Sequence, residues 1–303
     1  MKKSKVIILI LNYNGYLDTI ECVDSLLNIS YENFEIIIVD NKSTDDSIIN
    51  FKKKCWCDNV RILELDKNYG YAAGNNIGIK NALDNGAEYV CIMNNDVVVD
   101  KGFLDILVDE YEKDDNISII GPAICEYYDK EYIQSTGANI IIKKGQVPPI
   151  NTGVKLKNIN RENIKCDYVG GACMLFSGDT INSYGYMPEN YFLFFEETEW
   201  CYKIKKAGRD IVCSTKSVIY HKGSNSINKI GGLSKYFMER NLVIFVKRNG
   251  SLLEIIYFYI FIILRSIKRV IMKEEGLDTV RNYLDGFFNR INKRYKFAYI
   301  KKK

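Results

Sequence analysis

Val6-Ile-Ile-Leu-Ile-Leu-Asn-Tyr-Asn-Gly15 begins with six consecutive apolar residues and then becomes abruptly polar. An unbroken apolar run rich in β-branched residues is typical of a strand that is buried on both faces of a parallel sheet. We therefore predict a central strand over Lys5–Leu11. The run is too short for a secretory signal, and no small-residue cleavage site follows it.

Apolar strands and helical segments then alternate through the first third of the chain. Further strands are predicted at Phe34–Val39, Val60–Leu65 and Tyr89–Met93. Apolar residues at helical spacing alternate with them at Leu17–Leu27, Asp45–Lys54 and Ala72–Leu83. This rhythm predicts an α/β fold with a doubly wound, mostly parallel, Rossmann-like sheet and helices on both of its faces.

The second half of the chain is less regular. Residues 127–165 alternate only weakly and are predicted to form hairpins and loops. The remaining expected elements are a strand within Val169–Phe176, a helix at Glu196–Ala207, short strands at Ile211–Cys213 and Ser217–Tyr220, and helices from residue 232 onward.

Polar loops follow the first four predicted strands. They are Asn12-Tyr-Asn-Gly15, Asp40-Asn-Lys-Ser43, Asp66-Lys-Asn-Tyr-Gly70 and Asn94-Asn-Asp96. In doubly wound sheets, ligands bind beyond the carboxyl ends of the strands. Four such loops in succession therefore predict a shared ligand site at one edge of the sheet.

Composition excludes a disordered chain and a polytopic membrane protein. Of 303 residues, 47% are hydrophobic and 26% are charged, as in ordinary soluble proteins. The formal net charge is +4, but residues 265–303 carry 12 Lys and Arg against 4 Asp and Glu, a local net of +8. A basic tail of this kind is typical of segments that bind an anionic membrane surface or nucleic acid, and also of chain ends that are simply solvated. Since nothing else points to nucleic acid, we expect no nucleic-acid partner.

Nine cysteines are present, an odd number without a repeated spacing, and several lie inside apolar runs. This usage is typical of reduced, buried thiols in a cytoplasmic protein. Cys55-Trp-Cys57 is the one close pair, and no second pair completes a zinc site.

Two single residues and one acidic cluster are the best candidates for catalysis or metal binding. Asp96 ends the fourth strand without an evident capping role, whereas Asp100 fits the start of a helix. His221 is the one histidine in the chain, and histidine is a common metal ligand and proton carrier. The acidic cluster at Glu196, Glu197 and Glu199 follows an aromatic stretch, where burial would raise a carboxyl pKa toward the range of a general base.

Together these stretches resemble family 2 nucleotide-sugar glycosyltransferases with the GT-A fold, in particular their bacterial rhamnosyltransferase-like branch. Besides the loops above, the motifs that carry the resemblance are Asn68-Tyr-Gly-Tyr-Ala-Ala-Gly-Asn-Asn-Ile-Gly78, Gly170-Gly-Ala-Cys-Met174, Phe195-Glu-Glu-Thr-Glu-Trp-Cys201 and His221-Lys-Gly-Ser224. Each motif is weak alone, but their order over residues 6–224 is specific.

The resemblance implies a role for each matching residue. The donor-binding residues would be Asn12 and Asn14 at the nucleoside, Asp40 at the N3–H of uracil or thymine, Asn68 and Asn76 at the ribose, and Asn95 in the metal motif. Asp96 and His221 would hold Mn²⁺ or Mg²⁺. Glu197 stands where the family has an aspartate as catalytic base, and Glu196 is the competing candidate.

The implied activity is metal-dependent, inverting transfer of a sugar from a dTDP- or UDP-linked donor, with rhamnose as one candidate sugar. The acceptor would be a hydroxyl of a glycan or lipid-linked molecule in cell-surface polysaccharide synthesis. The alternatives are a non-catalytic nucleotide-sugar or glycan-binding protein and a sugar nucleotidyltransferase. The nucleotidyltransferase would need basic residues after the first strand, and Asn12-Tyr-Asn-Gly15 has none.

We expect residues 1–230 to form the catalytic domain, with a donor half at 1–100 and an acceptor half at 101–230, and residues 231–303 to form a basic helical region. Ile255–Leu264 is apolar, but ten helical residues span about 15 Å, half of a bilayer core. We therefore expect residues 251–273 to lie on a membrane surface, at the cytoplasmic face of the cell membrane. Packing on the body or in a dimer is the alternative.

Overall fold

A computed structural model describes residues 3–54, 56, 58–223, 232–272 and 277–298. Cys55 and Cys57, Ser224 of the last motif, and the ends of the 1–230, 231–303 and 251–273 segments lie outside the described residues. The strands are β1 (Val6–Asn12), β2 (Phe34–Asp40), β3 (Val60–Glu64), β4 (Tyr89–Asn94), β5 (Val97–Val99), β6 (Ile117–Glu126), β7 (Ile133–Ser135), β8 (Asn163–Cys166), β9 (Cys173–Ser177) and β10 (Asp210–His221).

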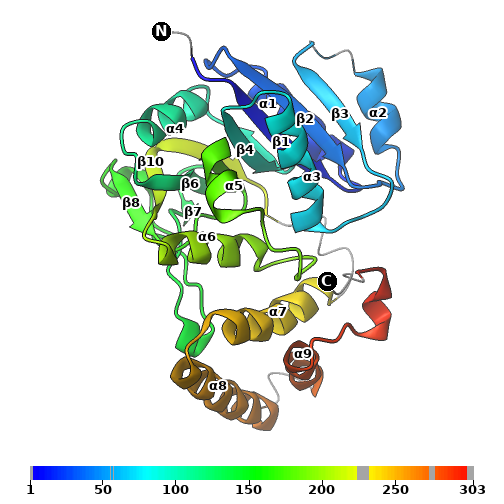
Figure 1. Cartoon of the computed structure of the whole chain (residues 1–303), viewed down its shortest axis with the longest axis vertical. Helices are drawn as coiled ribbons and strands as arrows, with labels where there is room; N and C mark the ends of the chain where they lie inside the picture. The colour runs from blue at the N-terminus through cyan, green and yellow to red at the C-terminus, as the bar shows by residue number, and fades with distance from the viewer. Residues whose placement is uncertain (1–2, 55, 57, 224–231, 273–276, 299–303) are drawn as a thin grey trace.

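Helices alternate with the early strands and then dominate the end of the chain (Figure 1). The α-helices are α1 (Tyr16–Leu26), α2 (Ser47–Lys53), α3 (Tyr71–Asp84), α4 (Phe103–Tyr111), α5 (Gly178–Tyr184), α6 (Glu196–Lys206), α7 (Leu233–Asn249), α8 (Leu252–Ile271) and α9 (Leu277–Phe287). Short 3-10 helices are η1 (Ile142–Lys144), η2 (Leu156–Asn158) and η4 (Lys293–Ala298).

The described strands form one ten-stranded mixed sheet with the order β3-β2-β1-β4-β9-β6-β10-β5, and β7 and β8 pair at its side. The strands β3, β2, β1 and β4 are parallel, as predicted. β9 runs antiparallel to both β4 and β6, while β10 is parallel to β6. The α/β fold class is therefore confirmed, with parallel pairing confined to the first four strands and the β6–β10 pair.

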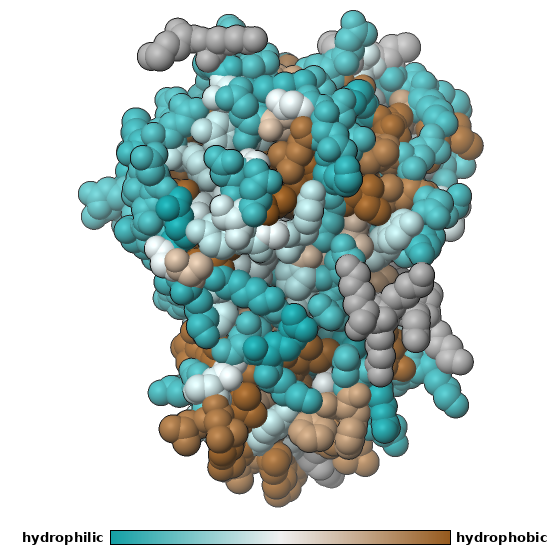
Figure 2. All heavy atoms as spheres, in the orientation of Figure 1, coloured by the Kyte–Doolittle hydropathy of each residue, from teal (hydrophilic) through white to brown (hydrophobic). Residues whose placement is uncertain are grey.

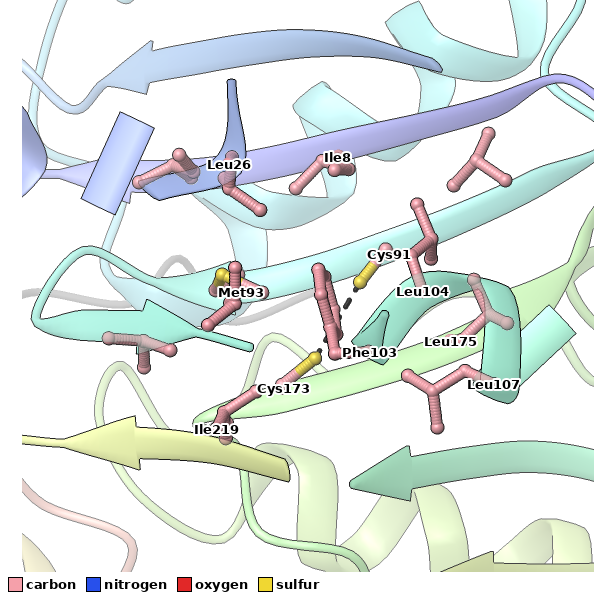
Figure 3. Packing of buried hydrophobic residues seen from close by; sticks show 14 of the residues in the cluster. Ile8, Leu26, Cys91, Met93, Phe103, Leu104, Leu107, Cys173, Leu175 and Ile219 are labelled. Atoms are coloured by element: carbon pink, nitrogen blue, oxygen red, sulfur yellow. Dashed lines mark hydrogen bonds between the residues drawn. The ribbon is translucent and has the colours of Figure 1, made fainter. Parts of the chain in front are cut away.

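β1 is buried on both faces because its side chains point alternately to two separate hydrophobic cores. Val6, Ile8 and Ile10 pack in the core that α1, α2 and α4 cover. Ile7 and Leu9 pack in the core on the other face, which α3, α5 and α6 cover. Figure 3 shows the first core, where Phe103, Leu104 and Leu107 of α4 lie over the sheet.

Two segments of the second half differ from the predicted elements. The expected strand within Val169–Phe176 begins at Cys173, because Gly171 forms a turn whose N–H donates to Tyr168 Oη at 2.9 Å. The two short strands expected near residues 211 and 220 are parts of β10, which has a bulge between Ser214 and Val218. Because the bulge interrupts the apolar pattern, the sequence indicates two short strands where the structure has one.

The chain ends in a helical extension, as predicted. Residues of α7 and α8, such as Phe245 and Phe258, share a hydrophobic core with Tyr191 and Phe195, which precede α6. Of the helices described here, none combines the length and the apolar content needed to span a bilayer. The seven described cysteines are buried and form no disulfide with one another.

Candidate active site

A cavity of about 650 Å³ lies beyond the carboxyl ends of β1, β2 and β4, where the polar loops were predicted to meet. Those loops supply one wall, which consists of Tyr13, Asn14, Asn41, Asn68, Asn94, Asn95 and Asp96. The opposite wall comes from residues 168–172, residues 192–198 and the start of α7. The first and second halves of the chain therefore meet at this cavity.

Of the predicted donor-binding residues, Asn14, Asn68 and Asn95 line the cavity. Asn41, which the sequence analysis did not single out, holds this wall in place. Its buried side chain donates to Asn68 Oδ1 at 3.1 Å and to the Gly70 carbonyl at 3.0 Å, and it accepts from the Tyr69 N–H at 2.8 Å. Its position directly after Asp40, in one of the polar loops, was the available signal.

Asn12 and Asp40 do not line the cavity. Asn12 Nδ2 donates to Asp40 Oδ2 at 2.9 Å, and Ser43 donates to both carboxylate oxygens of Asp40, at 2.6 and 2.8 Å. Both residues are buried beneath the polar loops of this wall. Asp40 Oδ1 accepts the Ser43 N–H, and a carboxylate oxygen has a second lone pair for a further donor.

Asn76 lies on α3, away from the cavity wall. Its side chain donates to the Met187 carbonyl at 2.9 Å and to Glu189 Oε1 at 3.0 Å, and it accepts from the Met187 N–H at 3.2 Å. Asn76 therefore supports residues 187–189, and it does not lie with the predicted donor residues that line the cavity.

Asp96 and His221 meet at the cavity, with Asp96 Oδ1 and His221 Nε2 3.2 Å apart. β4 leads into Asp96, and β10 ends at His221. Gln134 determines which imidazole nitrogen faces Asp96. Its Nε2 donates to Glu126 Oε2 at 2.8 Å and to the His221 carbonyl at 2.9 Å, so its Oε1 faces His221 Nδ1 at 2.9 Å.

This arrangement assigns the proton of neutral His221 to Nδ1, because the facing Gln134 oxygen can only accept. Nε2 then presents a lone pair to a carboxylate oxygen, and it has no hydrogen-bond partner within the described part of the chain. Two acceptors that face one another at 3.2 Å need either a shared proton or a metal cation between them. Neighbouring ligands of an octahedral ion, at bonds of about 2.1 Å, lie about 3 Å apart.

The pair therefore fits a divalent cation, and a hydrogen-bond acceptor that orients a histidine ligand, as the Gln134 oxygen does here, is typical of such sites. Within the described residues, no three His, Cys, Asp or Glu side chains gather around one point. Asp96 and His221 would supply two ligands, and oxygens of a bound diphosphate and water would have to complete the coordination.

Glu196 and Glu197 line the other side of the cavity at the start of α6. Burial raises the pKa of both carboxyls, and the neighbouring charge of Glu197 raises the pKa of Glu196 further. On Glu197, its own backbone N–H and, to a smaller extent, the nearby Tyr71 hydroxyl work in the opposite direction and lower the pKa, although that hydroxyl donates to the Gly171 carbonyl at 3.1 Å. Glu197 Oε1 lies so close to Gly171 that any side chain at that position would collide with it.

Glu199 points away from this pair and does not line the cavity. It accepts from Arg248 of α7 at 3.0 Å, pairs with Lys203 at 2.5 Å, and accepts from the Tyr191 hydroxyl. Burial opposes ionisation of Glu199, but these hydrogen bonds outweigh it and hold the pKa of the carboxyl below its usual value. Glu199 therefore links α6 to α7.

The aromatic loop before α6 has an unusual backbone. Phe192, Phe194 and Phe195 all line the cavity and have φ values of 72°, 68° and 75°, in the left-handed region that non-glycine residues rarely adopt. Asn241 of α7 donates to three carbonyls of this loop, those of Tyr191, Leu193 and Phe194, at 2.7 to 3.2 Å. Asn241 directly follows Glu239 and Arg240, so its surroundings in the sequence gave no signal of this role.

The family model described as "Glycosyl transferase family 2" matches residues 7–182, more than half of the chain. The low-salt glycan biosynthesis hexosyltransferase Agl10 of Haloferax volcanii is 26% identical over 219 residues, which cover 71% of this chain and 66% of that protein. The chain thus spans slightly less than two thirds of that relative. The dTDP-rhamnosyl transferase RfbF of Shigella flexneri is 23% identical over 81% of each chain.

A solved structure with a similar fold is the mannosyltransferase PcManGT from Pyrobaculum calidifontis, in complex with GDP-Man and Mn²⁺. Its TM-score is 0.61, with 15% identity, over 97% of this chain and 83% of that one. The likeness confirms the GT-A fold and its helical extension.

Proposed function

This chain belongs to glycosyl transferase family 2, and we propose that it transfers a sugar from a nucleoside diphosphate sugar to a hydroxyl group of an acceptor. One observation carries the proposal: the Asp96–His221 pair and the buried carboxyls of Glu196 and Glu197 open into the same cavity. The first pair suits a cation bound to a diphosphate, and the second suits removal of a proton from a hydroxyl.

The donor enters with its nucleoside against the loops that follow β1, β2 and β3. Asn14 and Asn68 provide amide groups on this wall, and Asp40 and Asn12 lie beneath it. We propose a dTDP- or UDP-linked donor, because the carboxylate of Asp40 can accept the N3–H that uracil and thymine share. The name of the Shigella relative supports rhamnose as a candidate sugar.

Asp96 and His221 would hold a divalent cation, Mn²⁺ or Mg²⁺, with the imidazole nitrogen favouring Mn²⁺. When bound, such a cation neutralises the negative charge that grows on the departing diphosphate. The presence of Mn²⁺ in the Pyrobaculum mannosyltransferase complex supports this proposal. Gln134 fixes the imidazole so that Nε2 remains available to the cation.

Glu197 is the catalytic base in this proposal, and Glu196 remains protonated beside it. Two adjacent buried carboxyls do not readily ionise together, so one of them releases its proton first. The backbone N–H of Glu197 and the nearby Tyr71 hydroxyl favour that outcome for Glu197. Glu196 Oε2 has no hydrogen-bond partner among the described residues, and the charge of Glu197 holds its proton more firmly.

The reaction then needs one displacement. The acceptor oxygen bonds to the anomeric carbon as its proton passes to Glu197, and the bond from that carbon to the diphosphate oxygen breaks on the opposite face. The configuration at the anomeric carbon is therefore inverted. No protein nucleophile is required, which agrees with a site that offers a base and a pair of cation ligands.

We place the acceptor, a hydroxyl of a glycan or of a lipid-linked molecule, on the side of the cavity formed by the aromatic loop and the start of α7. Cell-surface polysaccharide synthesis at the cytoplasmic face of the membrane is the setting that we propose. The division into a catalytic domain, residues 1–230, and a C-terminal region, residues 231–303, is part of the same proposal.

Calorimetry with UDP, dTDP, GDP and ADP, each with and without Mn²⁺, tests the proposal directly. We expect UDP or dTDP to bind more tightly with Mn²⁺, and Asp96→Ala to remove most of the Mn²⁺ effect. Asp100→Ala is the matched control, since this nearby aspartate does not line the cavity. Binding of ADP alone, or of no nucleotide, would overturn the transferase proposal, and preference for GDP would overturn the pyrimidine donor.

A further inference from the structure

α8 is apolar on two opposite sides. On its inner side, Phe258 and Ile262 are buried against α7 and η1. A helix with apolar residues on two opposite sides normally buries both of them. The outer side of α8 is nevertheless exposed in the isolated chain.

That outer side forms a continuous apolar surface at the end of the molecule farthest from β1, as Figure 2 shows. Its nine residues are between 48% and 78% exposed: Leu252, Leu253, Ile256, Tyr257, Ile260, Ile263, Leu264, Ile267 and Ile271. At 100° per residue they fall within an arc of about 140° over about 30 Å of helix. Monomeric soluble proteins rarely expose a contiguous apolar surface of this kind.

α9 extends the surface. Leu277, Leu284 and Phe287 are 43% to 63% exposed. The ring of Phe287 lies 5.6 Å from that of Tyr259, so α9 touches α8 directly. The two helices therefore present one docking face, which we define as the outer residues of α8 and the exposed apolar residues of α9.

We propose that this docking face lies in the interface of an anionic membrane. Lys268 is exposed at the edge of the apolar arc, and residues 265–303 carry a net charge of +8. An amphipathic helix with basic residues beside its apolar face is attracted by anionic headgroups and inserts its apolar side below them.

A second copy of the chain is the other occupant to consider. A symmetric dimer through the docking face buries the same surface on both copies, so it would bring the exposed Lys268 at the edge of that face into the interface twice. Like charges would then oppose association, whereas an anionic lipid surface attracts them. The positive charge beside the docking face therefore favours an anionic lipid surface over a second copy of the chain.

The membrane contact does not depend on the proposed chemistry, because lipid binding requires neither donor nor cation. α7 nevertheless joins the two sites. One side of it packs on α8, while Asn241 and Arg248 hold the aromatic loop and Glu199. A docked chain would therefore hold its cavity at a fixed distance from the lipid surface.

Sedimentation of the full chain with sucrose-loaded vesicles tests the proposal. We expect binding to phosphatidylcholine vesicles that contain phosphatidylglycerol, and much weaker binding to phosphatidylcholine alone. Ile260→Asp and Ile267→Asp should each weaken binding about tenfold, because each removes one inserted side chain. Lys268→Glu should weaken binding to the anionic vesicles only. Ile49→Asp, at an isoleucine on α2 that is 54% exposed, is the matched control and should bind as the wild type does.

Sedimentation velocity on the same proteins distinguishes the outcomes. A wild-type dimer that Ile260→Asp dissociates, without vesicle binding, would assign the docking face to a second copy and overturn the proposal. A monomer that binds neither type of vesicle would also overturn the proposal. Vesicle binding that persists in Asp96→Ala, which fails to bind nucleotide with Mn²⁺, would show that docking and chemistry are separate.

Discussion

At Glu197, the proposed base, burial determines the pH at which the ionised carboxylate is available. Because burial raises its pKa, we expect kcat/KM to rise with pH through an apparent pKa above the ordinary glutamate value of about 4.3. The base acts in its ionised form, so activity is lost as pH falls through the raised pKa. Glu197→Gln should lower kcat by a factor of about 10²–10⁴, measured as release of nucleoside diphosphate.

Glu196→Gln is the matched comparison, since the two residues are adjacent and both are buried. We expect it to retain most of the wild-type kcat and an acidic limb in its pH profile. The opposite result, in which Glu196→Gln is inactive and Glu197→Gln is active, would exchange the roles that we assign to them.

The same raised pKa values affect stability with the opposite sign. A buried carboxyl that keeps its proton in the folded state binds more protons folded than unfolded. The free energy of unfolding should therefore fall as pH rises from the usual glutamate pKa through the raised pKa of Glu196. Urea denaturation at a series of pH values should show a shallower fall for Glu196→Gln than for the wild type. Parallel curves would mean that Glu196 has no raised pKa in the folded chain.

Gln134 is a positioning residue for His221. Because the chain has one histidine, its imidazole signals in a spectrum need no further assignment. In ¹⁵N-histidine-labelled protein, one imidazole should give signals of the Nδ1–H tautomer. Gln134→Leu should lose this preference and bind Mn²⁺ about 10- to 100-fold more weakly, as for other residues that orient metal ligands. Gln134→Glu retains an acceptor and should keep the tautomer. An unchanged tautomer and Mn²⁺ affinity in Gln134→Leu would contradict the role.

At the scale of elements, α7 is a support for the aromatic loop. Asn241→Ala leaves three carbonyls of a left-handed segment without their donor, so we expect unfolding free energy to fall by about 2–4 kcal/mol. KM should also rise, because Phe192 and Phe194 form part of the cavity wall. Asn249→Ala removes one local bond within the same helix, to the Phe245 carbonyl, and should change neither quantity appreciably. Equal effects of the two substitutions would argue against a supporting role.

The first four strands were predictable because each is a short apolar run that ends in a polar loop. Parallel strands place those loops at one edge, so the shared site followed from local pattern alone. The antiparallel insertion of β9 between β4 and β6 was not predictable, since pairing with Val90 and Ile120 joins residues far apart in sequence. The supporting roles of Gln134 and Asn241 were not predictable either, because each contacts residues far away in the sequence.

Asp96, His221, Glu196 and Glu197 were singled out from the sequence, and the structure brings them to one cavity. Asn76 was grouped with them by motif position alone, yet its side chain braces Met187 and Glu189 instead. A motif preserves the order of residues along the chain. The way a helix packs in the fold decides which of its side chains face a site. Here the packing of α3 directs Asn76 away from the cavity.

At the scale of the whole molecule, the predicted catalytic and C-terminal regions share structure that a boundary near residue 230 would divide. Ile142, Tyr191 and Phe195 pack in one hydrophobic core with α7 and α8. Arg248 and Asn241 add buried polar contacts across the same boundary. We therefore expect the two regions to unfold in one cooperative transition.

Two probes can follow this transition separately. Both tryptophans, Trp56 and Trp200, lie before the boundary, so their fluorescence reports on the catalytic region alone. Hydrogen exchange measured by mass spectrometry on peptides of α7 reports on the C-terminal region. The two urea midpoints should coincide. If α7 exchanges freely at urea concentrations where Trp200 fluorescence is still native, the C-terminal helices fold as an independent unit, and the strained aromatic loop must hold its shape without Asn241.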